Sequence, residues 1–144
     1  MPIETDSEIR DVLSSVKTVA VVGASNKPER PAYYVTEFVQ KHGYRIIPVN
    51  PGQAGTKILG ETVYASLSDI PEPVDMVDVF RAPEHVGAIV DEMLALKDKP
   101  KVLWTQIGVV NREAEAKAEQ GGITVVSDRC PKIEIPRLSP KTPA

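Results

Sequence analysis

Five short apolar runs divide the chain, and each ends in a glycine, an asparagine or a charged turn. They predict strands at about 18–22, 45–49, 75–80, 101–107 and 123–126. Apolar residues at helical spacing, or a helix-starting proline, occupy the stretches between most of these runs. Strands that alternate with helices build a parallel sheet. We therefore predict an α/β protein, a single Rossmann-like domain with a doubly wound, mainly parallel five-stranded sheet.

Local signals place the expected helices and the ends of the domain. Thr5 to Glu8 form a capping-box pattern, so a lead-in helix is expected over about 5–16. Further helices are expected from Pro31 towards Gly43, from Pro83 onwards, and over about 111–120. A short additional strand is expected near 62–64. The predicted domain covers 1–136, and the proline-containing tail 137–144 is expected to be frayed.

Composition narrows the classes of partner. The 144 residues carry a formal net charge of −3, which gives no general attraction to nucleic acid or anionic lipid. The start of the chain has no signal-peptide pattern, and no apolar run approaches the roughly 20 residues of a membrane span. A single cysteine excludes an internal disulfide and fits a reducing compartment. We expect a cytoplasmic protein with no nucleic-acid or membrane partner.

The first strand ends in a turn suited to phosphate. In doubly wound sheets, ligands bind beyond the carboxyl ends of the strands, where a turn leads into a helix N-terminus. Only one glycine of the usual three is present here, and the alternative is a plain tight turn. Two nearby cations favour a pyrophosphate or a ribose phosphate. The candidate residues are Gly23, Ala24, Ser25, Asn26, Lys27 and Arg30.

Asn50 ends the second strand, where an NAD enzyme normally carries an acidic residue that binds the ribose hydroxyls. An amide cannot accept both hydroxyl protons as a carboxylate does, but it repels a ribose phosphate less. This position argues against NAD and allows a ligand that is phosphorylated on its ribose.

The third and fourth strands end in further candidates. Phe80, Arg81 and Pro83 could stack an adenine and pair with a phosphate, or be a core residue, a surface charge and a turn. Gln106 and Gly108 fit amide recognition and close backbone approach. Trp104 lies on the same strand face as Gln106, and packing under a helix is its preferred role.

Catalytic residues are scarce. His42 and His85 lack a metal-binding spacing and are expected at the surface. Cys130 is interpreted as a structural or incidental thiol, although Arg129 and Lys132 could lower its pKa and make it reactive. No serine nucleophile motif is present. We expect neither a metal site nor catalysis.

Several segments together resemble a known family, the CoA-binding domain family of small stand-alone bacterial proteins. The resemblance covers nearly the whole chain, and the segments occur in the family's order. They are residues 19–25, 30–31, 47–51, 58–61, 77–81, 102–109 and 128–134. The family is similar to the amino-terminal domain of the succinyl-CoA synthetase alpha subunit.

The resemblance implies coenzyme A or an acyl-CoA as the ligand. Residues 23–26 would contact the CoA phosphates, Pro51 to Gln53 the nucleotide end, and Gln106, Ile107 and Gly108 the adenine or the pantetheine arm. Two departures stand out. Gln53 replaces a lysine of the synthetases, with Lys57 further on, and the chain lacks the synthetase domain that presents a phosphorylated histidine. Ligase activity is therefore not implied.

Three functions remain open at this point. The leading one is a non-catalytic CoA or acyl-CoA carrier, sensor or partner protein. The alternative is a small NAD(P)-dependent oxidoreductase that uses the same crevice. The third is a scaffold with a vestigial crevice. Protein partners, the acyl group and the pathway stay open.

Overall fold

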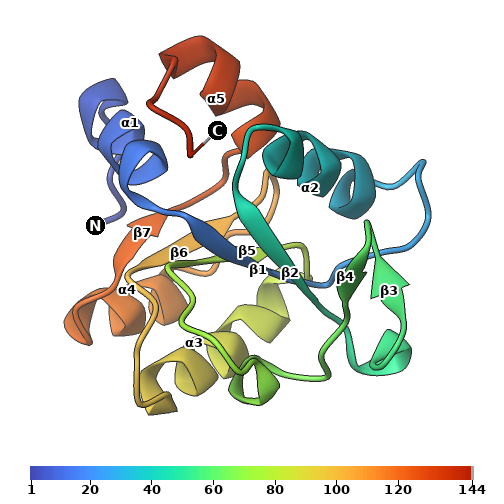
Figure 1. Cartoon of the computed structure of the whole chain (residues 1–144). Coiled ribbons are helices and arrows are strands. Elements are labelled where there is room, and N and C mark those ends of the chain that lie inside the picture. Colours follow the sequence, from blue (N-terminus) through green and yellow to red (C-terminus); the bar gives the residue numbers. More distant parts are fainter. Residues whose placement is uncertain (144) are drawn as a thin grey trace.

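The computed structural model describes residues 1–143 and shows a parallel sheet between two layers of helices (Figure 1). Its longer elements are α1 (Asp6–Ser15), β1 (Thr18–Val22), α2 (Pro31–Lys41), β2 (Arg45–Val49), β5 (Met76–Val79), α3 (Val86–Ala95), β6 (Val102–Thr105), α4 (Arg112–Gln120), β7 (Thr124–Val126) and α5 (Pro131–Leu138). Its short elements are the 3-10 turns η1 (Pro51–Gln53), η2 (Leu67–Asp69) and η3 (Pro83–His85), and the ribbon strands β3 (Lys57–Ile58) and β4 (Glu61–Thr62).

The main sheet has the strand order β2-β1-β5-β6-β7, and all its pairings are parallel. The order reverses between β1 and β5, where Val22 lies opposite Val79. This is the topological switch point, where doubly wound folds bind ligands. The predicted α/β fold is therefore confirmed. Phe80, Gln106 and Ile107 lie just beyond their strands rather than inside them.

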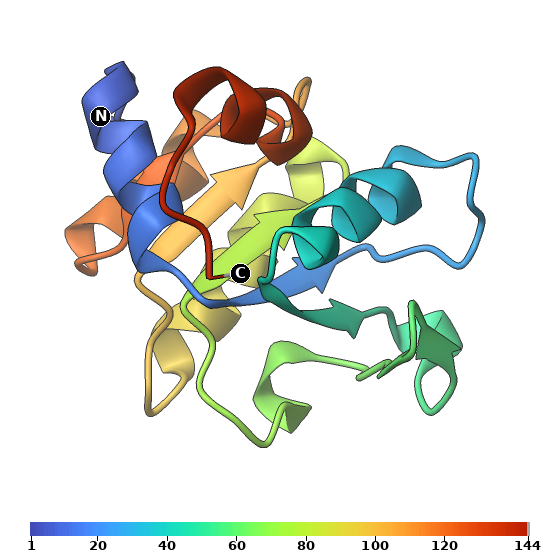
Figure 2. The ribbon, with the colours of Figure 1, turned by 45° about the horizontal axis from the view of Figure 1, so that its top comes forward.

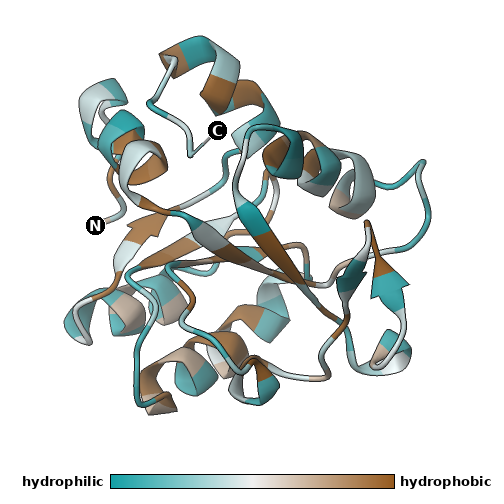
Figure 3. Ribbon diagram, viewed as in Figure 1, coloured by the Kyte–Doolittle hydropathy of each residue, from teal (hydrophilic) through white to brown (hydrophobic). Residues whose placement is uncertain are grey.

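Hydrophobic cores lie on both faces of the sheet. Residues of α1, α2 and α5 pack on one face, and residues of α3 and α4 pack on the other. Figures 1 and 2 show this division of the helices. In Figure 3 hydrophobic residues follow the central strands and the helix surfaces next to them. The strands are buried on both faces, as expected for parallel strands that read as continuous apolar runs.

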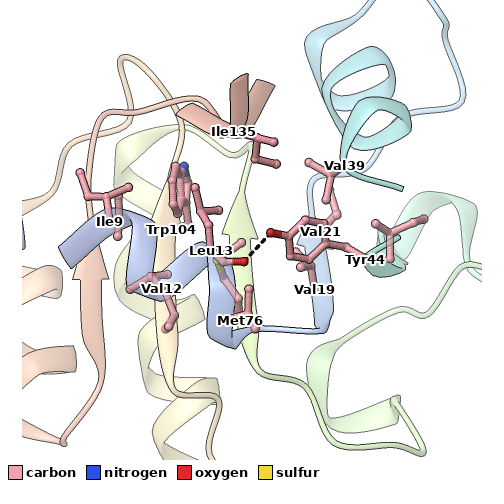
Figure 4. Close-up of a cluster of buried hydrophobic side chains, with 14 of the residues drawn as sticks. Ile9, Val12, Leu13, Val19, Val21, Val39, Tyr44, Met76, Trp104 and Ile135 are labelled. Atoms are coloured by element: carbon pink, nitrogen blue, oxygen red, sulfur yellow. Dashed lines mark hydrogen bonds between the residues drawn. The ribbon is translucent and has the colours of Figure 1, made fainter. Parts of the chain in front are cut away.

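Trp104 belongs to the core under α1 and α5 (Figure 4). Its side chain is fully buried, and its indole Nε1 donates a hydrogen bond of 2.8 Å to the Arg129 carbonyl. Packing under a helix, the role preferred from sequence, is thus confirmed. In the same core the Tyr44 hydroxyl donates to the Leu13 carbonyl, and burial raises the pKa of Tyr44 to about 12.

The helix α5 was not expected, and the boundary predicted after residue 136 falls inside it. Pro131 occupies its first turn, where proline is tolerated. The buried Glu134 pairs with Arg129 at 3.0 Å and with Arg137 at 2.6 Å. Leu138 is buried in the core.

The rest of the predicted tail has no regular structure up to residue 143, and its last residue, 144, lies outside the described residues. The backbone amide of Lys141 donates to Ser14 Oγ at 3.1 Å, so the segment after α5 turns back towards α1. Both ribbon views show this turn (Figures 1 and 2).

Irregular segments of the same chain lie along both outer strands of the sheet. Beside β2, the backbone amide of Tyr64 donates to the Pro48 carbonyl at 3.0 Å, and the Tyr64 carbonyl accepts from the backbone amide of Asn50 at 2.9 Å. Beside β7, the Ile3 amide donates to the Val125 carbonyl at 2.9 Å. Among the described residues, no helix is long and apolar enough to cross a bilayer.

Candidate functional site

Two adjoining clefts open at the carboxyl ends of the strands, beside the switch point. They have Gly23, Ser25 and Arg30 in common, so they meet at the first turn. The narrower cleft, of about 530 Å³, is lined by Val22, Gly23, Ala24, Ser25, Asn26, Lys27, Arg30, Val49, Asn50, Pro51, Gly52, Gln53 and Arg81. The wider cleft, of about 690 Å³, is lined by Gly23, Ser25, Arg30, Pro31, Ala32, Tyr34, Val35, Phe80, Gln106, Ile107, Val109, Cys130, Lys132 and Ile133.

Gly23 forms the turn between the two clefts. Its φ is +88°, a left-handed conformation that side chains disfavour. A Cβ here would lie 3.0 Å from Arg81 Cδ and 3.1 Å from the carbonyl oxygen of Phe80. The close approach of β1 and β5 at the switch point therefore requires glycine at this position.

Asn50 joins the first two strand ends. Its side-chain nitrogen donates to the Ala24 carbonyl at 2.8 Å, and its oxygen accepts from the Gly52 amide at 2.9 Å. Both ends of the amide are thus used to fix the loops that form the narrower cleft. Asn50 was predicted as a ligand residue, and the structure adds that it positions these loops.

Three cationic side chains surround the shared turn. Lys27, Arg30 and Arg81 all line the narrower cleft, and Arg30 also lines the wider one. None of these charged groups makes an ion pair or hydrogen bond with the described residues, whereas Arg45, Arg129 and Arg137 are all paired. Arg30 also precedes α2, whose first turn contains no acidic residue. The positive end of α2 and these three cations make the turn favourable for an anion.

Gln53 contributes an unsatisfied acceptor to the narrower cleft. Its Oε1 is buried and has no hydrogen-bond partner among the described residues. Buried acceptors are nearly always bonded, so this oxygen is available to a donor from a water molecule or a ligand. Gln53 stands where the resemblance expected a lysine, and Lys57 lies away from both clefts on β3.

Asp78 is the residue that sequence reasoning missed. It lies on β5 beneath the wider cleft, is 2% exposed, and accepts from Gln106 Nε2 at 3.0 and 3.3 Å. Burial raises the pKa of Asp78 to about 7, against the smaller opposite effect of this hydrogen bond. The signal in the sequence was a single acidic residue inside the apolar run from Met76 to Phe80.

Cys130 lines the wider cleft, but the neighbouring cations Arg129 and Lys132 do not lower its pKa overall. Burial raises the pKa of the Cys130 thiol, and the charge of Asp78 adds to this increase. Arg129 is paired with the buried Glu134 instead. The charge of Lys132 lowers the pKa of the thiol, as expected, but burial outweighs it and the net shift is upward, so a structural or incidental thiol remains the preferred interpretation.

Neither histidine lines the clefts. His42 bonds the Phe38 carbonyl through Nδ1 at 2.8 Å and stacks on the Phe38 ring, and His85 is exposed in η3. Across the described residues, no group of three histidine, cysteine or acidic side chains could hold a metal ion.

Pro83 and Gly108 are the two predicted site residues that line neither cleft. The Pro83 carbonyl accepts from Asn111 at 3.0 Å, and the Gly108 amide donates to Asp128 at 2.7 Å. Both therefore help to fix the loops that follow β5 and β6. The other predicted residues come together around the shared turn.

Known proteins resemble this chain over most of its length. Uncharacterized protein YneT of Bacillus subtilis is 40% identical over 127 residues, which are 88% of this chain and 91% of the relative. A solved structure from Thermus thermophilus is 44% identical with a TM-score of 0.88, covering 94% of this chain and 99% of that one. A hypothetical protein from Pyrococcus horikoshii OT3 is 39% identical with a TM-score of 0.88, covering 96% of each chain.

A larger enzyme contains a similar part. The alpha subunit of the ADP-forming acetate–CoA ligase I of Pyrococcus furiosus is 34% identical over 86 residues. These residues are 57% of this chain but only 19% of that subunit, so the chain matches about a fifth of its length. The family described as "CoA binding domain" matches residues 17–136, from just before β1 into α5. This chain belongs to the CoA binding domain family.

Proposed function

We propose that this protein binds coenzyme A or an acyl-CoA in the two joined clefts and serves as a non-catalytic carrier, sensor or partner protein. The observation that carries the proposal is the group of three unpaired cations, Lys27, Arg30 and Arg81, around the Gly23 turn. CoA has a pyrophosphate and a ribose 3′-phosphate, so it presents more negative charge to these cations than NAD does. Membership of the CoA binding domain family supports the same ligand.

The shape of the site also fits a long, two-part ligand. The narrower cleft, with its cations and the unsatisfied Gln53 oxygen, suits the nucleotide end. The wider cleft leads away past Phe80 and Gln106 and suits the pantetheine arm. The non-catalytic role is supported by the raised pKa of Cys130 and by the position of both histidines away from these linings.

Thermal unfolding with a set of nucleotides tests the ligand. A ligand at a hundredfold excess over its Kd adds about 2.7 kcal/mol to the free energy of unfolding, which raises the Tm by several degrees. CoA should give a clear increase, dephospho-CoA a smaller one and NAD little. An increase with NAD or NADP that equals the increase with CoA would overturn the proposal in favour of an oxidoreductase.

Arg81→Ala tests the phosphate contact in the same protein. Loss of a charge-assisted hydrogen bond should weaken CoA binding by about 1.5–3 kcal/mol in calorimetry. The Tm of the free protein should change by only about a degree or two, because Arg81 has no ion pair to lose. Lys99→Ala, at an exposed position outside both clefts, is the control. Equal CoA affinity of the Arg81 variant and the control would make Arg81 a plain surface charge.

A further inference from the structure

Exposed apolar side chains gather around the wider cleft. Among the described residues, the large hydrophobic side chains that are markedly exposed are Met1, Tyr34, Ile107 and Ile133. The last three all line the wider cleft, although they come from α2, the loop after β6, and α5. Single exposed apolar residues are ordinary, but a group that meets at one cleft marks a binding site.

The two clefts differ in chemistry along their length. The narrower one carries Lys27, Arg81 and the Gln53 oxygen, whereas the wider one adds Val35, Val109 and the apolar group above. Because the clefts meet at Gly23, a single ligand can occupy both. One end of such a ligand must be anionic and its other end apolar.

The wider cleft has polar groups beside its apolar ones, among them Gln106, Arg30 and Lys132. Gln106 is 8% exposed, and its Nε2 is held by Asp78, while its Oε1 has no partner among the described residues. That oxygen can accept one amide hydrogen from a pantetheine arm. Beyond it lies Cys130, whose raised pKa keeps the thiol uncharged. Lys132 is held over the rings of Tyr34 and Phe38, at 5.6 and 5.8 Å from their centres.

We infer that the part of the wider cleft formed by Tyr34, Ile107 and Ile133 binds an apolar acyl group of a CoA thioester. The inference rests on the proposed function, since the nucleotide end must occupy the narrower cleft. A volume of about 690 Å³ is within the range of small-molecule pockets and leaves room for both an arm and a chain. A CoA thioester whose aliphatic acyl group is longer than acetyl should thus bind more tightly than free CoA and more tightly than acetyl-CoA.

The test is a calorimetric titration of the protein with CoA, acetyl-CoA, butyryl-CoA and hexanoyl-CoA. A fully buried methylene contributes up to about fourfold in affinity. Hexanoyl-CoA should therefore bind the unmodified protein at least about tenfold more tightly than acetyl-CoA. Equal affinities across the series would overturn the acyl site and leave the proposed function standing. If CoA itself does not bind, the proposed function fails as well.

Ile133→Asp locates the effect. Ile133 is exposed in the first turn of α5, where an acidic residue is compatible with the helix. In this variant hexanoyl-CoA should bind no more tightly than acetyl-CoA. Ala88→Asp, an equal charge change at an exposed position of α3, should keep the ratio of the unmodified protein.

The same variants address self-association through this cleft. If the chain-length series is flat and the mass of the free protein rises with concentration in the unmodified chain but not in Ile133→Asp, the apolar group joins two copies of the chain. That result overturns the acyl site.

Discussion

A single carboxyl group, that of Asp78, lies closest to the chemistry of the site without entering either cleft. It is held beneath Gln106 between the two central strands, so it can influence the wider cleft only through that amide. In the sequence it is a single acidic residue inside an apolar run, which marks it as unusual but does not identify its partner. Spacing rules report which residues face a core, and they contain no information on the partner of one buried acid.

Asp78 should make the stability of the protein depend on pH. Its pKa of about 7 in the folded protein is above the usual 3.8, so the folded state retains a proton that the unfolded chain has released. The free energy of unfolding should therefore fall as the pH rises from about 4 through 7. This contribution is at most about 4 kcal/mol.

Urea unfolding from pH 4.5 to 8 checks this dependence. The free energy of unfolding of Asp78→Asn should fall less with rising pH than that of the unmodified protein. The variant should therefore become more stable relative to the unmodified protein towards pH 8. The exposed control Asp98→Asn should follow the unmodified protein. Parallel curves for the unmodified protein and Asp78→Asn would show that Asp78 is ionised throughout.

At the scale of elements, periodicity predicted the strands well, because each apolar run is buried on both faces of the sheet. It missed α5, because Pro131 and Pro136 read as breaks in a short, charged segment. Tertiary contacts explain why this segment is helical: Ile135 and Leu138 are buried in the core, and Arg137 pairs with Asp6 of α1 at 2.9 Å. The strand ends were predicted as the site because a parallel sheet brings all of them to one edge. Pro83 and Gly108 also follow strand ends, but neither residue lines a cleft, although the neighbours of Gly108, Ile107 and Val109, do.

The turn between β1 and α2 should be more sensitive to substitution than other left-handed turns. Gly23→Ala adds both a strained φ, at about 1–2 kcal/mol, and a methyl group against the backbone of Phe80. Gly122→Ala has nearly the same φ, +89°, but its added Cβ meets nothing within 4 Å. Urea unfolding should show that Gly23→Ala loses about 1–3 kcal/mol more of the free energy of unfolding than Gly122→Ala does. Equal losses in the two variants would mean that the strand contact at Gly23 adapts.

At the scale of the whole molecule, the clefts, the cations and the helix end belong to one side of the sheet, beyond its strand ends. We expect the purified chain to form no thioester from a nucleoside triphosphate, an organic acid and CoA, because no histidine of the described residues lines either cleft. Chromatography of the reaction mixture, with an active ligase as positive control, measures this. Sustained turnover by the chain alone would contradict the prediction.

The segments along the outer strands have a consequence for how copies of this protein can meet. Sheets commonly polymerise by adding a foreign strand to an exposed edge. Here the backbone amide of Tyr64 already bonds the Pro48 carbonyl on β2, and Pro48 has no backbone N–H to donate. On β7, the backbone amide of Ile3 bonds the Val125 carbonyl. These positions are closed to fibril-like growth. A foreign strand would have to displace these segments before it could extend the sheet at these positions.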